Sequence, residues 1–128
     1  MPFRDIAAKE LAKIFSLLAH PDRVRIIEEL GAGEKDVNSL QAVLGVSHSR
    51  TSQNLAVLRT SRIVTERRDG RHVFYRLAQP ELAGWILEGL RFIEGDAQAS
   101  EARLNAFEKA RQKWGSEAAG ELLFTNRD

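Results

Sequence analysis

The sequence predicts a mostly helical α+β fold with one small β-hairpin, contained in a single domain. Three observations support this prediction. Apolar residues recur at helical spacing over most of the chain, two short helical runs meet at the two residues 46–47, and two strand-like runs flank Asp69-Gly70, a dipeptide typical of two-residue hairpin loops. With 128 residues, 43% of them hydrophobic, the chain can form one core but not two domains of ordinary size.

The first part of the chain predicts three helices. Residues 5–18 form an amphipathic helix, because their apolar side chains fall on one stripe and their charged side chains lie largely off it. Pro21 fits the first turn of a second helix, which Gly31 and Gly33 end, and the loop Gly-Ala-Gly-Glu-Lys-Asp covers residues 31–36. A short third helix stops at Gly45; Asn38 or Ser39 can cap it, and its expected buried face consists of Leu40, Val43 and Leu44.

A fourth helix and a hairpin complete the central part. Ser47 is the expected N-cap of helix 48–60, whose inward-facing residues are Leu55 and Leu58. The runs 63–68 and 71–77 are the arms of the hairpin, in which Val73, Tyr75 and Leu77 alternate on one face. Two helices joined by a tight turn and followed by a hairpin predict a winged helix-turn-helix, with additional N- and C-terminal helices.

Positive charge is concentrated in one part of this fold. Residues 46–80 contain seven Arg and only two acidic residues, although the 19 Lys and Arg of the whole chain nearly cancel its 18 Asp and Glu. A solvated face would interleave acidic partners with the basic residues, whereas here the basic residues gather on the two elements that a winged helix turns toward DNA. We therefore expect double-stranded DNA to be the anionic partner.

Helix 48–60 and the wing 64–77 are expected to divide the contacts with DNA between them. The major groove admits one α-helix, whose N-terminal turns reach the base edges; Arg can pair with guanine there, and Gln or Asn with adenine. Wing arginines would meet phosphates, which supply salt-dependent affinity. The candidate DNA-binding residues are Ser47, His48, Ser49, Arg50, Thr51, Gln53, Asn54, Arg59, Arg67, Arg68, Arg71 and His72.

Three motifs in this order resemble the ArsR/SmtB family of winged-helix repressors. They are the His-Pro-Asp-Arg helix start at residues 20–23, the Leu-Gly-x-Ser turn at 44–47 and the Arg-Asp-Gly-Arg wing at 68–71, and the resemblance covers roughly residues 10–78. It implies a homodimer that binds a palindromic operator and represses transcription until a metal or another signal releases it.

The sequence departs from the family pattern at two places. The family's usual Ser-Arg-His-Leu reads Ser-Gln-Asn-Leu at residues 52–55, which implies a different base preference. The family's usual Ala-Gly-Leu-Val after the recognition helix reads Ser-Arg-Ile-Val at residues 61–64. Arg62 thus replaces a glycine at a helix exit, where a positive φ is uncommon for any other residue.

The metal sites of the family have no counterpart in the pattern of this sequence. The chain has no Cys, its late helical segment has no His, and its three His residues are scattered over a helix start, the recognition helix and the wing. Glu88, Glu94 and Asp96 together would make a poor zinc site and at best a weak site for a hard cation. We predict no cofactor and no metal.

The segment after Pro80 contains more helix than a winged helix needs. Its apolar stripe over residues 81–114 carries two Trp residues, and Gly89 and Gly95 make a bend or break near residues 94–100 plausible. The stripe can belong to an internal core or to a two-fold interface formed with the first helix, and we favour the interface. Its candidate residues are Ile6, Leu11, Ile14, Leu82, Trp85, Ile86, Leu90 and Ile93. The domain is expected to span residues 1–114, including dimerisation helices 5–18 and 81–114, and residues 115–128 a loosely ordered tail.

Other function classes receive less support. No catalytic triad, Cys-His pair, phosphate-binding glycine loop or paired-carboxylate motif is present above chance, so we do not expect an enzyme. A winged helix can also serve as a protein-interaction module without specific DNA binding. The sequence lacks an apolar run of membrane-spanning length, so we expect a cytoplasmic, nucleoid-associated protein without a membrane partner. An unidentified small-molecule inducer, release through another partner and constitutive repression all remain compatible with the sequence.

Overall fold

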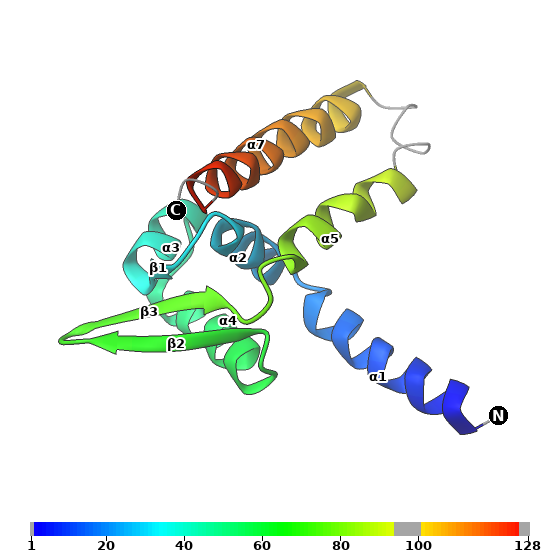
Figure 1. Cartoon of the computed structure of the whole chain (residues 1–128), viewed down its shortest axis with the longest axis horizontal. Coiled ribbons are helices and arrows are strands. Elements are labelled where there is room, and N and C mark those ends of the chain that lie inside the picture. The colour runs from blue at the N-terminus through cyan, green and yellow to red at the C-terminus, as the bar shows by residue number, and fades with distance from the viewer. Residues whose placement is uncertain (1, 94–100, 126–128) are drawn as a thin grey trace.

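The chain begins with the long helix α1 (Pro2–Leu18), followed by α2 (Pro21–Gly31), the short strand β1 (Lys35–Asp36) and the helix pair α3 (Val37–Leu44) and α4 (His48–Thr60). The hairpin of β2 (Val64–Asp69) and β3 (His72–Leu77) comes next. Helix α5 (Leu82–Glu88), the 3-10 helix η1 (Gly89–Phe92) and α7 (Glu101–Thr125) complete the fold (Figure 1). This computed structural model describes residues 2–93 and 101–125. The predicted winged helix-turn-helix is confirmed.

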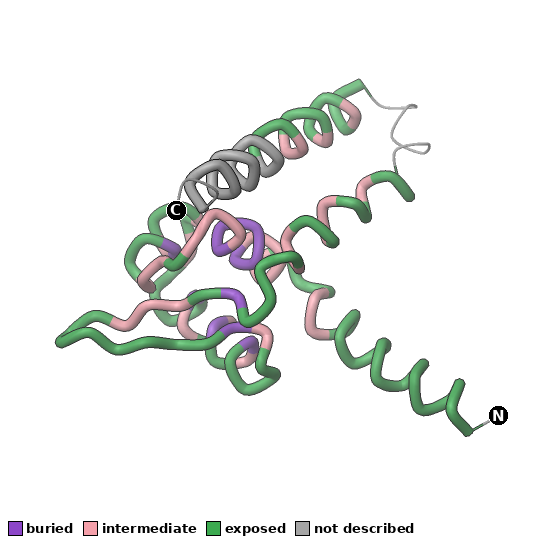
Figure 2. Tube along the Cα trace, in the orientation of Figure 1, coloured by how far each residue is buried: buried purple, intermediate pink, exposed green. Residues whose placement is uncertain are grey.

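One hydrophobic core holds α2, α3, α4 and the base of the hairpin together (Figure 2). Burying an aliphatic side chain of this size contributes roughly 1.5–3 kcal/mol, so the core is the main source of the stability of this region. Leu82 and Ile86 of α5 pack against it while remaining partly exposed. The buried apolar residues are Ile26, Ile27, Leu30, Leu40, Leu55, Leu58, Val64 and Leu77.

The two helices of the turn have well-defined ends. Ser47 caps α4 as expected, because its hydroxyl accepts a hydrogen bond from the Arg50 N–H at 3.1 Å. Gly45 ends α3 in the left-handed conformation, with φ 70°. The expected cap of α3 was wrong: Asp36 rather than Asn38 or Ser39 is the N-cap, and it accepts a hydrogen bond from the Ser39 N–H at 2.8 Å. A carboxylate three residues before a free helical N–H is well placed for this role.

Helix α3 buries a narrower face than predicted. Leu40 is fully buried and Leu44 is partly buried, but Val43 is 42% exposed. Residues 40 and 44 lie one above the other on a helix, whereas residue 43 is rotated by about 100° from residue 44. Leu40 and Leu44 therefore face the core, and Val43 remains at the surface.

The sheet has three antiparallel strands in the order β1-β3-β2, one more than the sequence predicted. Strand β1 pairs Lys35 with Tyr75 and Asp36 with Phe74, in the segment expected to be a loop. The hairpin turn also lies one residue later than predicted, because Asp69 pairs with His72 and leaves Gly70 and Arg71 as the loop. Only Gly70 of these two has a positive φ (62°), as in a type II′ turn, in which the first loop residue is the one that favours glycine.

Helix α1 projects away from the domain, and only its last turn reaches the core (Figures 1 and 2). None of its residues is buried, and its apolar stripe is open to solvent. An isolated helix of this length is only marginally stable in water. Helix α1 therefore requires a surface that the described part of this chain does not supply.

Helices α5 and α7 lie side by side, and each contacts α2 (Figure 1). A Cβ added to Gly31 of α2 would come within 2.6 Å of the Ala83 Cβ, so the close approach of α5 requires glycine at this position. The residues at which a break was expected, 94–100, lie outside the described residues. Residues 115–128 were expected to form a loose tail; in the structure α7 runs through Gly115 and Gly120 as far as Thr125, because each interior glycine costs a helix only about 1 kcal/mol.

The exit from α4 stores backbone strain. Arg62 has φ 63°, and it is the one non-glycine residue with positive φ in the described part of the chain. Its N–H donates to the Arg59 carbonyl at 2.9 Å, and the N–H of Ile63 donates to the Leu58 carbonyl at 2.9 Å. These bonds and the buried Val64 hold the chain in a conformation that costs an L-residue roughly 1–2 kcal/mol.

Replacing Arg62 with glycine should therefore stabilise the protein. We expect Arg62→Gly to raise the free energy of unfolding by roughly 0.5–1 kcal/mol, because the relieved strain exceeds the added entropy of the unfolded chain. Arg62→Ala is the matched control, since it removes the side chain but keeps the strain. Urea denaturation measures both variants, and equal stabilities of the glycine and alanine variants would contradict the account.

Candidate nucleic-acid interface

The first two turns of α4 present polar side chains on a rigid support. Thr51, Leu55 and Leu58 are each 0% exposed, which fixes the rotation of the helix about its axis. The opposite face is consequently open to solvent, and its exposed residues include Ser47, His48, Ser49, Arg50 and Gln53. Donors and acceptors on the N-terminal turns of a fixed helix are what reading of base edges requires.

Two residues predicted to contact DNA have internal roles instead. Thr51 is fully buried, and its hydroxyl donates to the Ser47 carbonyl at 3.0 Å, so Thr51 belongs to the core. Asn54 is half-buried; its Oδ1 accepts from Arg23 Nε at 3.0 Å and its Nδ2 donates to the Arg50 carbonyl at 3.1 Å. In this arrangement the oxygen and the nitrogen of the Asn54 amide each have a partner within the protein.

Arg50 is exposed but not free. Its Nε lies 2.5 Å from Asp22 Oδ2 at the start of α2, and its side chain nevertheless remains 62% exposed. The carboxylate lies against the Nε edge of the guanidinium, and most of the side chain is still open to solvent. A DNA base would therefore meet an arginine that is already oriented.

The arginines of the wing fall into two groups. Arg67 forms two hydrogen bonds with Glu34, at 2.6 and 3.2 Å, and lies 4.7 Å from the centroid of the Phe74 ring. This pairing lowers the pKa of Glu34 and raises that of Arg67. Arg59 is likewise paired, with Glu66 at 3.1 Å. Within residues 2–93 and 101–125, by contrast, Arg68 and Arg71 form no ion pair and are exposed.

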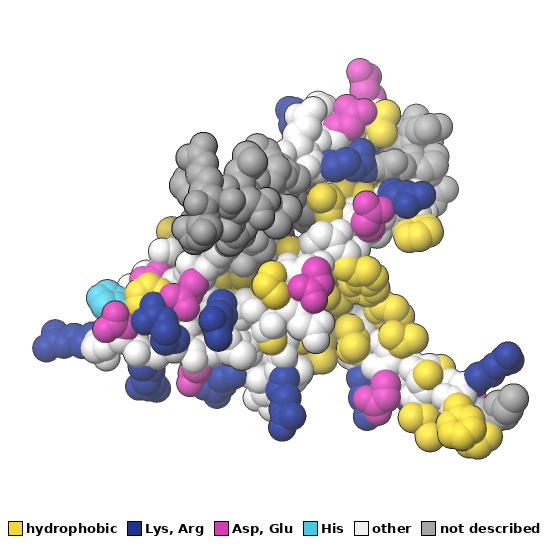
Figure 3. All heavy atoms as spheres, viewed as in Figure 1, with side chains coloured by type: hydrophobic (Ala, Val, Ile, Leu, Met, Phe, Trp, Pro, Cys, Tyr) yellow, Lys and Arg dark blue, Asp and Glu magenta, His cyan; other side chains and the backbone are white. Residues whose placement is uncertain are grey.

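Basic side chains gather along the hairpin on the surface seen in Figure 3, whereas apolar side chains gather where α1 and α5 meet. His72 lies at the base of the loop, with its ring 6.1 Å from that of Phe74. Arg68 and Arg71 lie beside and within the loop at the tip, whereas Arg76, which also forms no ion pair among the described residues, lies near the base of the hairpin and donates from Nε to Thr65 Oγ1 at 3.3 Å. This distribution suits the tip for phosphate contacts.

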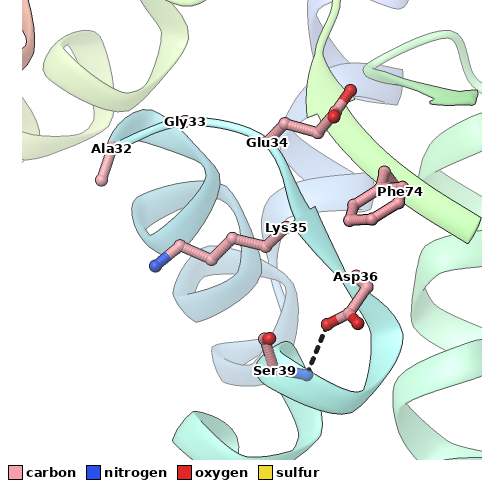
Figure 4. A pocket seen from close by; sticks show the side chains of 7 residues that line it. All are labelled: Ala32, Gly33, Glu34, Lys35, Asp36, Ser39 and Phe74. Carbon is pink, nitrogen blue, oxygen red and sulfur yellow. Dashed lines mark hydrogen bonds between the residues drawn. The ribbon is translucent and has the colours of Figure 1, made fainter. Parts of the chain in front are cut away.

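A pocket of about 400 Å³ lies beside β1, and Figure 4 shows the residues that line it: Ala32, Gly33, Glu34, Lys35, Asp36, Ser39 and Phe74. Its charged groups have partners already: Glu34 binds Arg67, Lys35 binds Glu29, and Asp36 caps α3. Among the described residues, no group of three or more His, Cys, Asp or Glu side chains could hold a metal ion. Glu94 and Asp96, which the sequence suggested as partners of Glu88, lie outside these residues.

The predicted interface residues separate into exposed and partly buried sets. On α1, Ile6, Leu11 and Ile14 are 61%, 51% and 41% exposed. On α5 and just after η1, Trp85 and Ile93 are 52% and 42% exposed, while Leu90 is half-buried. Leu82 and Ile86 pack against their own core while remaining partly exposed, and their assignment to the interface stays a prediction. Trp85 stacks on Phe15 with centroids 6.1 Å apart, so α1 and α5 form one apolar surface.

Comparison with known proteins shows to which family this chain belongs. The profile described as "bacterial regulatory protein, arsR family" matches residues 20–66. The biofilm growth-associated repressor of Agrobacterium fabrum is 39% identical over 86 residues, which cover 67% of this chain and 74% of that protein. The chain belongs to the ArsR family. It is accordingly a DNA-binding transcriptional regulator and not an enzyme.

Solved structures of ArsR-type proteins show the same fold. The transcriptional repressor BigR from Xylella fastidiosa aligns with a TM-score of 0.63 and 34% identity, over 72% of this chain and 93% of that chain. A possible ArsR-family regulator from Mycobacterium bovis, described as homodimeric, aligns with a TM-score of 0.59 and 26% identity over 73% and 85%. Both alignments leave more than a quarter of this chain without a counterpart. The described part of this ArsR-family chain contains no helix long and apolar enough to cross a membrane.

Sequence reasoning missed three residues at this interface: Asp22, Arg23 and Glu34. Each forms a contact with a residue that lies 28, 31 or 33 positions later, namely Arg50, Asn54 or Arg67. The helix start at residues 20–23 was a visible signal, but periodicity does not show which residues meet across the fold. The partners of Asp22 and Arg23 became evident only from the packing of α2 on α4, and the partner of Glu34 only from the pairing of the strands in the sheet.

The cap of α3 should make stability depend on pH. Hydrogen bonds from Ser39 lower the pKa of Asp36, so the charged carboxylate stabilises the fold above its ordinary pKa, and this contribution is lost as the pH falls through the folded-state pKa. Asp36→Asn keeps an acceptor but does not titrate. We expect the difference in unfolding free energy between wild type and Asp36→Asn to shrink as the pH falls from about 7 to about 3. Denaturant titrations at several pH values measure this, and a pH-independent difference would contradict it.

Proposed function

We propose that the protein is a homodimeric repressor that binds a palindromic operator, with α4 in the major groove and the wing along the phosphates. The observation that carries this proposal is the exposed polar face of α4, which three fully buried residues fix, together with Arg68 and Arg71 of the wing, which are exposed and form no ion pair among the described residues. The helix face offers base-reading groups, and the wing offers phosphate-binding groups. The protein would act on nucleoid DNA in the cytoplasm.

The dimer part of the proposal rests on the apolar surface of α1 and α5. Helix α1 has no buried residue and exposes Phe3, Ile6, Leu11, Ile14 and Phe15, and Trp85 extends this surface onto α5. Apolar patches of this extent mark interaction sites in soluble proteins. The homodimeric Mycobacterium bovis relative supports a second copy as the partner. A two-fold dimer places its two reading helices about 34–36 Å apart, one turn of DNA, which is why we expect a palindrome.

The proposal predicts that α4 chooses the sequence. An operator duplex can be selected from a random library by the wild-type protein and compared with a scrambled duplex of equal length. Arg50→Ala or Gln53→Ala should weaken operator binding by roughly 1–3 kcal/mol and relax preference at one base pair in each half-site. Equal losses on both duplexes would instead indicate a nonspecific basic surface. A protein-interaction module would show no salt-dependent affinity for either duplex.

The wing arginines should contribute differently to DNA affinity, depending on whether each one already has an ion-pair partner. Arg71→Ala should weaken operator and scrambled DNA alike and lower the slope of log K against log salt by about one unit per wing. Arg67→Ala is the matched control, because Glu34 already holds that side chain, and its slope should stay within about half a unit of wild type. Titrations at four salt concentrations measure both slopes. If Arg67→Ala lowered the salt slope as much as Arg71→Ala does, the proposed difference between paired and unpaired wing arginines would be refuted.

Charge placed on α1 should break the dimer. Leu11 is 51% exposed on the apolar stripe, and Lys9 lies largely off that stripe on the same helix. We expect Leu11→Glu to shift the protein to monomer in sedimentation velocity and to weaken operator binding, since burying an unpaired carboxylate in an apolar interface is costly. Lys9→Glu should remain dimeric. A Leu11→Glu dimer of wild-type stability would place the interface elsewhere.

A further inference from the structure

The first turn of α2 holds α4 at two points. Asp22 Oδ2 lies 2.5 Å from Arg50 Nε, and Arg23 Nε donates to Asn54 Oδ1 at 3.0 Å. A second nitrogen of Arg23, Nη1, donates to the Leu17 carbonyl in the last turn of α1 at 3.2 Å. Two adjacent residues thus connect the reading helix with the helix that carries the proposed dimer surface.

Together with one hydrogen bond inside α4, these contacts form a closed ring of interactions around Arg50. Asn54 Nδ2 donates to the Arg50 carbonyl at 3.1 Å, so Arg23 reaches the backbone of Arg50 through Asn54 while Asp22 reaches its side chain. We call Asp22, Arg23, Arg50 and Asn54 the clasp. Asn54 and Arg23 are half-buried, and Asp22 is only 19% exposed, so the clasp is a built feature rather than a chance surface contact.

The orientation of Arg50 matters because its possible DNA contacts differ in what they require. A bidentate pair with guanine needs the guanidinium in one plane and at one distance, whereas a phosphate accepts it in many orientations. A carboxylate beside Arg50 restricts its rotamers and also repels phosphate. Both effects favour the base contact over the backbone contact, which is how a repulsive element produces specificity.

We propose that Asp22 and Arg23 are the positioning residues of sequence reading: Asp22 orients Arg50 toward a base edge and away from phosphates, and Arg23 fixes α4 against α2 and the last turn of α1. This inference rests on the proposed function, because it requires that Arg50 reads a base. It assigns the charged pair of the helix start at residues 20–23 a role in specificity. It also means that a displacement of α1 changes the position of the reading helix in the same protomer.

The experiment compares four proteins on two duplexes: wild type, Asp22→Asn, Arg50→Ala and the double variant. The duplexes are the one that wild type selects from a random library and its scrambled counterpart, and the measured quantity is the ratio of their dissociation constants. Asp22→Asn should bind the scrambled duplex about two- to fivefold more tightly, because an anion near the phosphates is gone. The specificity ratio should fall about tenfold. In the Arg50→Ala background, Asp22→Asn should leave the ratio unchanged.

Three further single variants and one double variant separate positioning from general effects of charge or folding. Glu108→Gln removes an exposed carboxylate from α7 and should leave the ratio at its wild-type value. Arg23→Lys keeps the charge but cannot donate to Asn54 and Leu17 with the same geometry, so it should lower the specificity ratio. Circular dichroism should show that its secondary structure is unchanged. Asn54→Ala should lower the ratio similarly, and the Arg23→Lys, Asn54→Ala double variant should be no worse than either single one.

The outcomes distinguish this inference from the proposed function. If Asp22→Asn retains the wild-type ratio, or lowers it equally with and without Arg50, the positioning role is overturned while sequence-specific binding by α4 stands. If the wild-type protein enriches no sequence from the library, the proposed function fails and the inference fails with it. A ratio that falls only when Arg50 is present supports both.

Discussion

The burial of one face of α4 is the constraint on which the rest of the structure depends. Leu55 and Leu58 insert into the core formed with α2 and α3, and Thr51 completes this face one turn earlier. Each buried leucine contributes roughly 1.5–3 kcal/mol, so a rotation of α4 by even one residue would be costly. The same constraint determines which side chains remain outside. The face that can read DNA is therefore fixed by apolar packing on the opposite side of the helix, before any contact with DNA is made.

Ion pairs then determine what the exposed cations can do. Counting arginines over residues 46–80 suggests a uniformly basic surface, but Arg50, Arg59 and Arg67 each have a carboxylate partner. Exposed pairs of this kind stabilise a fold by only about 0–1 kcal/mol, so their main consequence is orientation. Arg68 and Arg71 keep their full attraction for phosphate. The surface thus combines paired arginines on α4 and β2 with Arg68 and Arg71, which form no ion pair among the described residues, near the wing tip. The apolar surface of α1 and Trp85 is suited to bring two such units together.

Local patterns were sufficient to predict most of the fold. Helical periodicity located the helices, Gly45 and Ser47 defined the turn, and the Asp-Gly signal located the hairpin to within one residue. The predictions were wrong where the structure of a segment depends on a contact with residues far away in the sequence. Strand β1 forms only because β3 lies beside it, Thr51 is buried because α2 packs on α4, and Asn54 and Arg67 are held by Arg23 and Glu34. Sequence reasoning identified the candidate reading residues as a group, but it could not separate those that face DNA from those that hold the helix in place.

Hydroxyl-radical footprinting on the selected operator, combined with measurement of binding stoichiometry, tests the central claim most directly. Two reading helices related by a two-fold axis should protect two half-sites centred about 10 base pairs apart, with two chains bound to each duplex. Arg50→Ala should leave the positions of protection unchanged while requiring more protein to reach them. A single protected half-site at saturation, or uniform protection along the duplex, would contradict the account, because neither pattern can come from a dimer that reads DNA through α4.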